Sequence, residues 1–292
     1  MNFYEWFFEE KGREPAGLFS FGHLFSVTLT LAIFLTLAFF LGRRFKDNEK
    51  KKNLVLLIAA IAIVTLQIAK ITYLLIHTDD VVDCLIGNAP LYFCDIMIFV
   101  IPLAALTRGR FRDWCLDFIA ICGLLMGFMG NYFAGNLYPS HAIISWSAMV
   151  ALLNHSISAF ASMFVWAAKM NKMEKKNIPF VIGLLFVFMT IALIMAYAFD
   201  KNFMFYFRGD GTPFTLFDEH LSFGIKPIYQ LWIYVLQCGY MGIFYAVYYP
   251  VINKINSKKE NKQLETKEES KEVYEEKGRH YWRWPSGIKH SL

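Results

Sequence analysis

The chain has 292 residues, of which 56% are hydrophobic and only 18% are charged, and its mean hydropathy is +0.38. A soluble core of this length cannot hide so much apolar surface, so the composition excludes an ordinary water-soluble domain and predicts a membrane protein. The net charge of +5 does not indicate a nucleic-acid partner, because the basic residues fall in short gaps between apolar runs.

The first residues do not have the pattern of a cleaved signal peptide. Five charged residues lie among the aromatic residues of Met1–Arg13, where a signal peptide has a basic start followed by an apolar stretch. We therefore expect residues 1–17 to form a segment outside the cytoplasm.

Seven long apolar runs follow, each near the roughly 20 residues that cross ~30 Å of hydrocarbon. They are Leu18–Leu41, Leu54–Ile76, Pro90–Leu106, Trp114–Met129, His141–Ala168, Pro179–Phe199 and Pro227–Pro250. The sequence thus predicts an all-α polytopic membrane protein, with a domain of about seven transmembrane helices over residues 18–250.

The charges in the gaps predict the orientation of these helices. Basic residues follow the first, third and fifth runs, and cytoplasmic loops carry such an excess. They are Arg43, Arg44, Lys46, Lys50, Lys51, Lys52, Arg108, Arg110, Arg112, Lys169, Lys172, Lys175 and Lys176. The gap 77–89 instead holds Asp79, Asp80 and Asp83 with no Lys or Arg. We expect the N-terminus outside and the charged tail 251–292 in the cytoplasm, helical as far as Glu269.

Two runs also predict local structure. The fifth is too long for one perpendicular crossing, so we expect its first turns to lie in the interface after Pro139. In the fourth, Gly123, Gly127 and Gly130 recur at the spacing that lets a neighbouring helix backbone approach closely.

The cysteines do not form a metal site. Cys84, Cys94, Cys115, Cys122 and Cys238 make no CxxC pair and have no zinc-ligand spacing with histidine. We expect no metal and no soluble cofactor.

Polar side chains inside the apolar runs are functional candidates, because each costs several kcal/mol in hydrocarbon unless it is paired or faces a wet cavity. With the predicted orientation, most of these candidates lie toward the outer side of the membrane. They are His23, Lys70, Cys94, Asp95, Asn154, His155 and Gln230.

The depth of His155 depends on where the fifth helix begins. A helix beginning at His141 would place His155 on the order of 20 Å deep, whereas Cys94 lies only ~6 to 9 Å below the outer boundary. A helix beginning near Met149 would place His155 ~10 Å deep, where the two side chains can meet.

A cysteine, a histidine and an Asp or Asn can together perform nucleophilic acyl transfer, in which a thiolate attacks an ester and the imidazole moves the proton. Lys70 would hold a phosphate or favour the thiolate. Structural alternatives stay open for each residue. Cys94 can be a small packed hydrophobe, His23 and His155 can make interhelical hydrogen bonds, Lys70 can extend to the outer headgroups, and Asp95 can cap a helix or pair with Lys70.

Several short motifs together resemble a known family. The run Ala89–Asp95 resembles the proline-leucine-x-x-cysteine signature of the YwaF / transmembrane protein 164 family. Asn202–Phe205, the Pro213 loop and Pro227–Gln230 are similar to that family's connection between its sixth and seventh helices.

His23 and Asn154-His155 also match positions of that family, and the resemblance runs from about Leu18 to Pro250. It implies a polytopic α-helical fold and, as in the eukaryotic relatives, acyltransferase activity on lysophospholipids. Carried over, Cys94 is the nucleophile and His155 the base. The resemblance also favours a multi-pass protein of a bacterial cell membrane.

Our interpretation is an intramembrane acyltransferase whose partner is a membrane lipid, phospholipid or lysophospholipid, near the outer leaflet. Asn154 or Asp95 would orient His155, Lys70 or His23 would engage the phosphate, and Gln230 lies on the same side. The alternative is a transporter or lipid-binding membrane protein whose polar groups line a cavity without covalent chemistry. Such transporters commonly contain an internal repeat, and we find no clear one here.

Overall fold

The computed structural model describes residues 2–281, and every regular element among these residues is helical. The predicted all-α fold is confirmed. In chain order the elements are α1 (Phe3–Phe7), α2 (Phe21–Phe45), α3 (Glu49–Ile76), α4 (Val81–Gly87), the 3₁₀ turn η1 (Phe93–Asp95), α5 (Ile96–Leu106), α6 (Gly109–Tyr132), α7 (Trp146–Ala167), η2 (Lys175–Asn177), α8 (Ile178–Phe199), η3 (Phe203–Phe205), the π turn η4 (Phe217–Leu221) and α9 (Lys226–Tyr281).

Six helical segments of the described residues are long and apolar enough to cross a membrane, and a seventh is shorter. The six are Phe21–Phe45, Glu49–Ile76, Gly109–Tyr132, Trp146–Ala167, Lys175–Phe199 and Lys226–Lys254. The predicted third run forms only the short apolar helix Phe93–Leu106, which at 1.5 Å per residue extends about 21 Å. The chain is therefore a multi-pass helical membrane protein, with six candidate spans and one shorter apolar helix among the described residues.

The short third helix follows from the residues before it. Pro90 has no N–H to donate, and a residue that precedes proline is disfavoured in the α conformation. The chain therefore leaves α4 in an irregular stretch, and Tyr92 is extended, with φ −91° and ψ 161°. The Tyr92 N–H then donates to Asp95 Oδ2 at 3.1 Å, which closes the first turn. As a result, Cys94 lies on the opening turn of this helix.

The long fifth run is divided as the sequence predicts. Helix α7 starts only at Trp146, where the Ser145 hydroxyl accepts a hydrogen bond from the Ala148 N–H at 3.3 Å. His155 is nine residues along the helix from Trp146, or about 14 Å at 1.5 Å per residue. This distance lies between the two depths that the sequence allowed, and nearer the shorter one.

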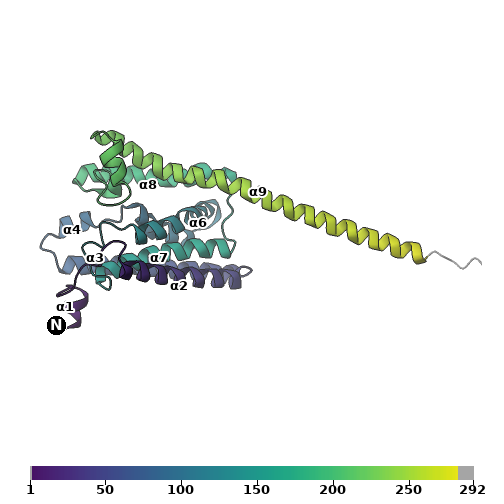
Figure 1. Ribbon diagram of the computed structural model, residues 1–292, viewed down its shortest axis with the longest axis horizontal. Coiled ribbons are helices and arrows are strands. Elements are labelled where there is room, and N and C mark those ends of the chain that lie inside the picture. The colour runs from purple at the N-terminus through teal and green to yellow at the C-terminus, as the bar shows by residue number, and fades with distance from the viewer. Residues whose placement is uncertain (1, 282–292) are drawn as a thin grey trace, which may run out of the picture. The chain divides into compact units, whose positions relative to one another are not determined.

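Four helices form a closed ring of neighbours. Helix α3 packs on α5, α5 on α6, α6 on α7 and α7 back on α3, while α2 lies along the outside of α7. Figure 1 shows these helices running alongside one another. Because the ring closes, side chains that point inward from four distant segments share one interior.

Glycines bring α6 and α7 into close contact. A Cβ added at Gly123 would lie 2.6 Å from the Ser158 carbonyl oxygen, and one at Gly127 would lie 2.5 Å from the Ala159 Cβ. No real side chain fits at such distances, so the predicted small-residue packing of the fourth run is confirmed.

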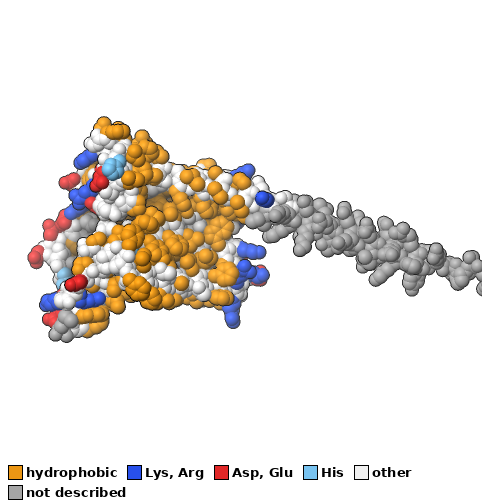
Figure 2. All heavy atoms as spheres, viewed as in Figure 1, with side chains coloured by type: hydrophobic (Ala, Val, Ile, Leu, Met, Phe, Trp, Pro, Cys, Tyr) orange, Lys and Arg blue, Asp and Glu red, His pale blue; other side chains and the backbone are white. Residues whose placement is uncertain are grey.

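The two ends of the helices differ in charge. Arg43 and Arg44 end α2, and Lys50 and Lys51 lie at the start of α3. We call this the basic end; Figure 2 shows blue side chains beyond one edge of the orange apolar band, and red and blue side chains beyond the other. This asymmetry is the one from which the sequence predicts a cytoplasmic basic end.

The N-terminal segment is fastened to the connection between α6 and α7. The Glu10 carboxylate pairs with His141 Nδ1 at 2.7 Å and accepts from the Ala142 N–H at 2.5 Å. The Arg13 guanidinium donates to the Ile144 carbonyl at 2.8 Å. The first residues thus cover the end of the bundle opposite the basic end.

The chain divides into two compact units, Met1–Met241 and Gly242–Leu292. The second unit contains the remainder of α9, which continues to Tyr281 and so extends beyond the predicted helix end at Glu269. Residues 282–292 of the predicted tail lie outside the described residues.

Candidate functional site

Three predicted site residues lie within electrostatic range of a fourth, Lys70. The Lys70 ammonium on α3 lies within electrostatic range of Cys94 and Asp95 on η1 and of His155 on α7. These residues come from three segments that are far apart in the sequence. The structure therefore places a thiol, a carboxyl group and an imidazole within electrostatic range of one ammonium group.

The Cys94 thiol is paired with the neighbouring carboxylate. Cys94 Sγ donates to Asp95 Oδ1 at 3.9 Å, and the other carboxylate oxygen accepts from the Tyr92 N–H at 3.1 Å. Asp95 therefore closes the opening turn of the helix and contacts the thiol at the same time. Both side chains are half-buried.

The His155 ring lies directly against α6. A Cβ added at Gly130 would be 2.4 Å from both Nε2 and Cδ2 of the ring, so only glycine leaves room for this position. His155 Nδ1 is buried and has no hydrogen-bond partner among the described residues, and the same holds for Asn154 Oδ1. The imidazole thus has a nitrogen available for a ligand or for water.

Asn131 adds a polar group that our sequence candidates did not include. Its side chain is fully buried, its Nδ2 donates to the Ser156 hydroxyl at 3.4 Å, and its Oδ1 has no partner among the described residues. Asn131 follows Gly130 on α6, and Ser156 follows His155 on α7. The sequence signal was present, because a polar residue ends an apolar run on the same side as the other candidates.

His23 has a structural role instead of the predicted phosphate contact. Its Nδ1 accepts from the Phe19 N–H at 3.0 Å, so the ring proton is assigned to Nε2, which donates to the Asn131 carbonyl at 2.9 Å. The ring is fully buried, with its centroid 4.0 Å from that of Tyr138. With both nitrogens occupied, His23 fits the interhelical hydrogen bond that the sequence left open.

Gln230 also lies apart from this group. Its Nε2 donates to the Tyr197 hydroxyl at 2.7 Å and to the Tyr206 carbonyl at 3.4 Å. These bonds tie the start of α9 to α8 and to the connection after α8. None of them is with the residues around Lys70, so we leave Gln230 out of the site.

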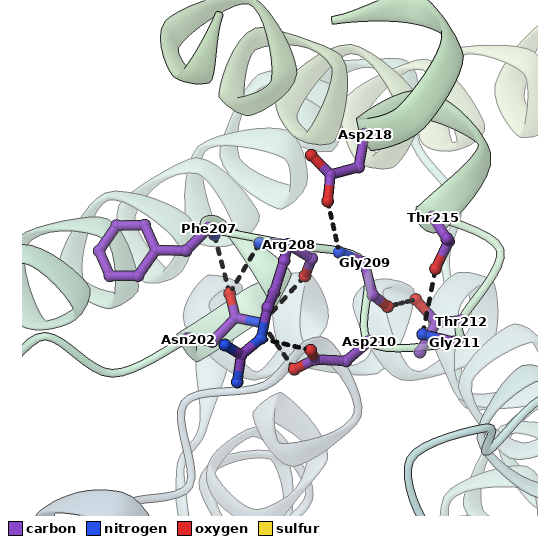
Figure 3. A network of polar contacts seen from close by, with 9 residues as sticks. All are labelled: Asn202, Phe207, Arg208, Gly209, Asp210, Gly211, Thr212, Thr215 and Asp218. Carbon is purple, nitrogen blue, oxygen red and sulfur yellow. Dashed lines mark hydrogen bonds and ion pairs between the residues drawn. The ribbon is translucent and has the colours of Figure 1, made fainter. Parts of the chain in front are cut away.

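The connection between α8 and α9 packs on the Cys94 turn. The ring of Tyr92 lies 6.3 Å from that of Phe203 and 5.2 Å from that of Phe205. A network of polar contacts centred on Asn202 holds this connection, as Figure 3 shows. The same connection touches the loop between α6 and α7, since a Cβ at Gly135 would lie 2.2 Å from the Gly211 carbonyl oxygen.

A second buried polar cluster lies nearer the basic end. Asp117 on α6 is fully buried, and it accepts from the Lys172 and Met173 N–H groups at 3.0 Å and from Asn177 Nδ2 at 2.8 Å. The sequence analysis missed Asp117, although a lone carboxylate in an apolar run is itself a signal. Its bonds fix the start of the connection between α7 and α8.

The group around Lys70 supplies the parts of a nucleophilic site. A thiol can attack a carbonyl carbon, an imidazole can exchange a proton, and an ammonium can hold an anionic headgroup. No group of three His, Cys, Asp or Glu side chains that could hold a metal is found in the described part of the chain.

Comparison with known proteins gives one match. The model of the TMEM164 family matches residues 18–245, which is the membrane part of the chain. No curated protein and no solved structure matches.

Proposed function

This chain belongs to the TMEM164 family, and from the geometry of its membrane site we propose that it is an acyltransferase that acts on phospholipid or lysophospholipid. The observation that carries the proposal is that Lys70 lies within electrostatic range both of a thiol paired with a carboxylate and of an imidazole whose buried Nδ1 has no partner among the described residues. Structural polar groups in apolar surroundings are normally paired, so a free nitrogen within electrostatic range of a cation that also acts on a thiol favours a reactive site.

The first half-reaction transfers the acyl chain to the protein. The Cys94 thiol gives its proton to His155, and the thiolate attacks the ester carbonyl of a phospholipid, forming a C–S bond. The C–O bond then breaks, and the leaving hydroxyl of the lysophospholipid takes the proton back from His155. The products are an acyl thioester on Cys94 and a lysophospholipid.

The second half-reaction reverses these roles. The hydroxyl of an acceptor lysophospholipid gives its proton to His155 and attacks the thioester carbonyl. A C–O bond forms, the C–S bond breaks, and the sulfur recovers the proton. Because one ester replaces another, no cofactor or other energy source is required.

The Lys70 ammonium can bind the negatively charged phosphate of a lipid substrate. An ammonium within an apolar bundle attracts the lipid phosphate and also the thiolate of Cys94. Asp95 holds the thiol on its turn, and Asn154 precedes the base with a buried oxygen that has no partner. Under the predicted orientation, with the N-terminus outside, this site serves the outer leaflet.

The test is acyl exchange by the purified protein in liposomes that contain a phospholipid and a labelled lysophospholipid. We expect Cys94→Ala to lower the turnover by at least about 10³-fold, because no other group can form the thioester. Cys84→Ala is the matched control, since Cys84 is also half-buried and free, and it lies on the neighbouring helix α4.

Two outcomes would contradict the proposal. Unchanged exchange in Cys94→Ala would remove the covalent mechanism. Movement of intact lipid between leaflets by wild type and Cys94→Ala alike, without acyl exchange in either, would favour the alternative of a transporter.

A further inference from the structure

The connection after α8 begins with a side chain that makes an unusual number of hydrogen bonds. Asn202 Oδ1 accepts from the Phe207 N–H at 2.8 Å and from the Arg208 N–H at 3.3 Å. Its Nδ2 donates to the Arg208 carbonyl at 2.9 Å and to Asp210 Oδ2 at 2.8 Å. Figure 3 shows these bonds closing residues 202–210 into a compact loop, which we call the Asn202 loop.

The backbone of the Asn202 loop is strained. Met204, Phe205 and Asp210 have positive φ values of 53°, 63° and 47°, a region that residues other than glycine rarely adopt. Each such residue is unfavourable and persists only where its surroundings hold it. The surroundings here are the bonds of Asn202 and the full burial of Phe203, Met204 and Tyr206.

Two aromatic residues of the Asn202 loop, one of them strained, pack on Tyr92. Phe203 and Phe205 place their rings 6.3 and 5.2 Å from the Tyr92 ring. The charges of Asp210 and Arg208 in the same loop act on the Tyr92 hydroxyl. The Asn202 loop therefore contacts Tyr92 through its aromatic side chains and surrounds its hydroxyl with charge.

Tyr92 is joined to the thiol through Asp95. Its N–H donates to Asp95 Oδ2 at 3.1 Å, and Asp95 Oδ1 accepts from Cys94 Sγ at 3.9 Å. The contacts thus run without a gap from the Asn202 loop to the thiol, across two segments that are more than 100 residues apart. The irregular stretch before the Cys94 turn has no helix of its own to hold it, so the loop supplies a rigid support.

We propose that Asn202 is a positioning residue: it holds the Asn202 loop in its strained form, and the loop holds Tyr92 and so fixes the turn that carries Cys94. This proposal rests on the proposed function in one respect, because the acyltransferase reaction is what requires a fixed Cys94 thiol. Asn202 contacts neither the thiol nor the imidazole, so its effect on the reaction passes through Tyr92.

The first test is the rate at which N-ethylmaleimide alkylates Cys94 in the full chain in lipid nanodiscs, followed by mass spectrometry of the Cys94 peptide. We expect Asn202→Ala to raise this rate about five- to tenfold, because the loss of several hydrogen bonds frees the half-buried turn. Asn48→Ala is the matched control: Asn48 caps α3 through one bond to the Lys51 N–H, at the basic end. Cys115 and Cys122, both fully buried, must stay slow to react, which shows that the bundle is folded.

The second test is a double-mutant cycle with Tyr92→Ala. If the loop acts through Tyr92, the two changes in alkylation rate will not multiply, and the double variant will resemble Tyr92→Ala alone. Independent, multiplying effects, or an unchanged Cys94 rate in a folded Asn202→Ala, would overturn the proposal.

Measurement of acyl exchange distinguishes a failure of this proposal from a failure of the proposed function. With both correct, Asn202→Ala lowers kcat about tenfold and leaves KM near its wild-type value, since the thiol is misplaced while the lipid contacts remain. If wild type shows no exchange but the alkylation results hold, the positioning role stands and the acyltransferase is lost. If Asn202→Ala keeps full kcat, the positioning role is lost and the acyltransferase stands.

Discussion

Two buried polar clusters that share helix α6 differ in how completely their groups are paired. Near the basic end, both oxygens of Asp117 are occupied by donors from the connection between α7 and α8. About 21 Å further along α6, at the other end, Asn131 Oδ1, Asn154 Oδ1 and His155 Nδ1 are buried without partners among the described residues.

We interpret this difference as the one between a structural cluster and the site of the proposed reaction. A buried polar group without a partner costs roughly 1 to 3 kcal/mol, and native proteins keep few of them. Asp117 shows that this bundle can satisfy a charge completely within an apolar helix. Three unsatisfied atoms together at the opposite end therefore favour a place where water or a substrate supplies the missing bonds.

The largest expected effect is on the imidazole. We expect His155→Gln to lower acyl exchange by about 10² to 10⁴-fold, the usual contribution of a general acid–base. The unfolding midpoint in detergent should stay close to wild type, because Nδ1 has no bond to lose. A large loss of thermal stability with little loss of turnover would place His155 with the structural cluster instead.

The opposite result is expected at the structural cluster. Asp117→Ala leaves two backbone N–H groups and the Asn177 amide without their acceptor, and it should lower the free energy of unfolding by about 3 kcal/mol. Chemical denaturation in detergent micelles measures this change. Turnover per folded molecule should be nearly unchanged, and a selective loss of turnover would show that the two clusters are coupled.

A smaller effect is expected from moving the imidazole without removing it. Gly130→Ala forces the His155 ring to shift, because the new Cβ would lie 2.4 Å from it, and kcat should fall about 10- to 100-fold. Gly183→Ala is the control, since a Cβ there has nothing within 4 Å. Equal kcat in the two variants would mean that the position of the ring is unimportant to turnover.

The smallest effect concerns the pH dependence of stability at Tyr138, whose ring packs on that of His23. Burial raises the pKa of Tyr138, in the connection between α6 and α7, from 10.0 to about 12. The unfolded chain therefore loses this proton first as the pH rises, so the stabilising contribution of the neutral phenol is complete below pH 10.0 and is lost as the pH approaches 12.

We expect the stability of the wild type relative to Tyr138→Phe to be lower at pH 11 than at pH 8, by about 1 kcal/mol. Thermal unfolding of both proteins at the two pH values measures the difference. A gap between the two proteins that does not change with pH would mean that Tyr138 titrates like an exposed tyrosine.

Much of the architecture was predictable from local sequence. Hydropathy alone requires long helices, because a backbone in hydrocarbon must satisfy its own hydrogen bonds. The excess length of the fifth run correctly predicted a late start of α7, and the glycines of the fourth run correctly predicted its close contact with α7. The third run was less predictable. Its apolar residues predict a helix from Pro90, whereas the helical turns begin only at Phe93.

The candidate site residues, too, were only partly predictable from the sequence. Their residue types and approximate depth could be read from the sequence, because polar groups are conspicuous in apolar runs. Their partners could not: His23 and Gln230 looked like site residues as much as Lys70 did, and only the packing shows that their hydrogen bonds are made elsewhere. The support that the Asn202 loop gives to Tyr92 joins residues more than 100 positions apart and has no local signal.

The order of polar and apolar residues along the chain was sufficient for the long apolar helices and for the polar residue types within them, since these follow from the cost of leaving peptide groups and charges in lipid. The tertiary structure alone decided which polar groups are satisfied and which are not. That distinction depends on contacts between distant segments, and no pattern within one segment encodes them.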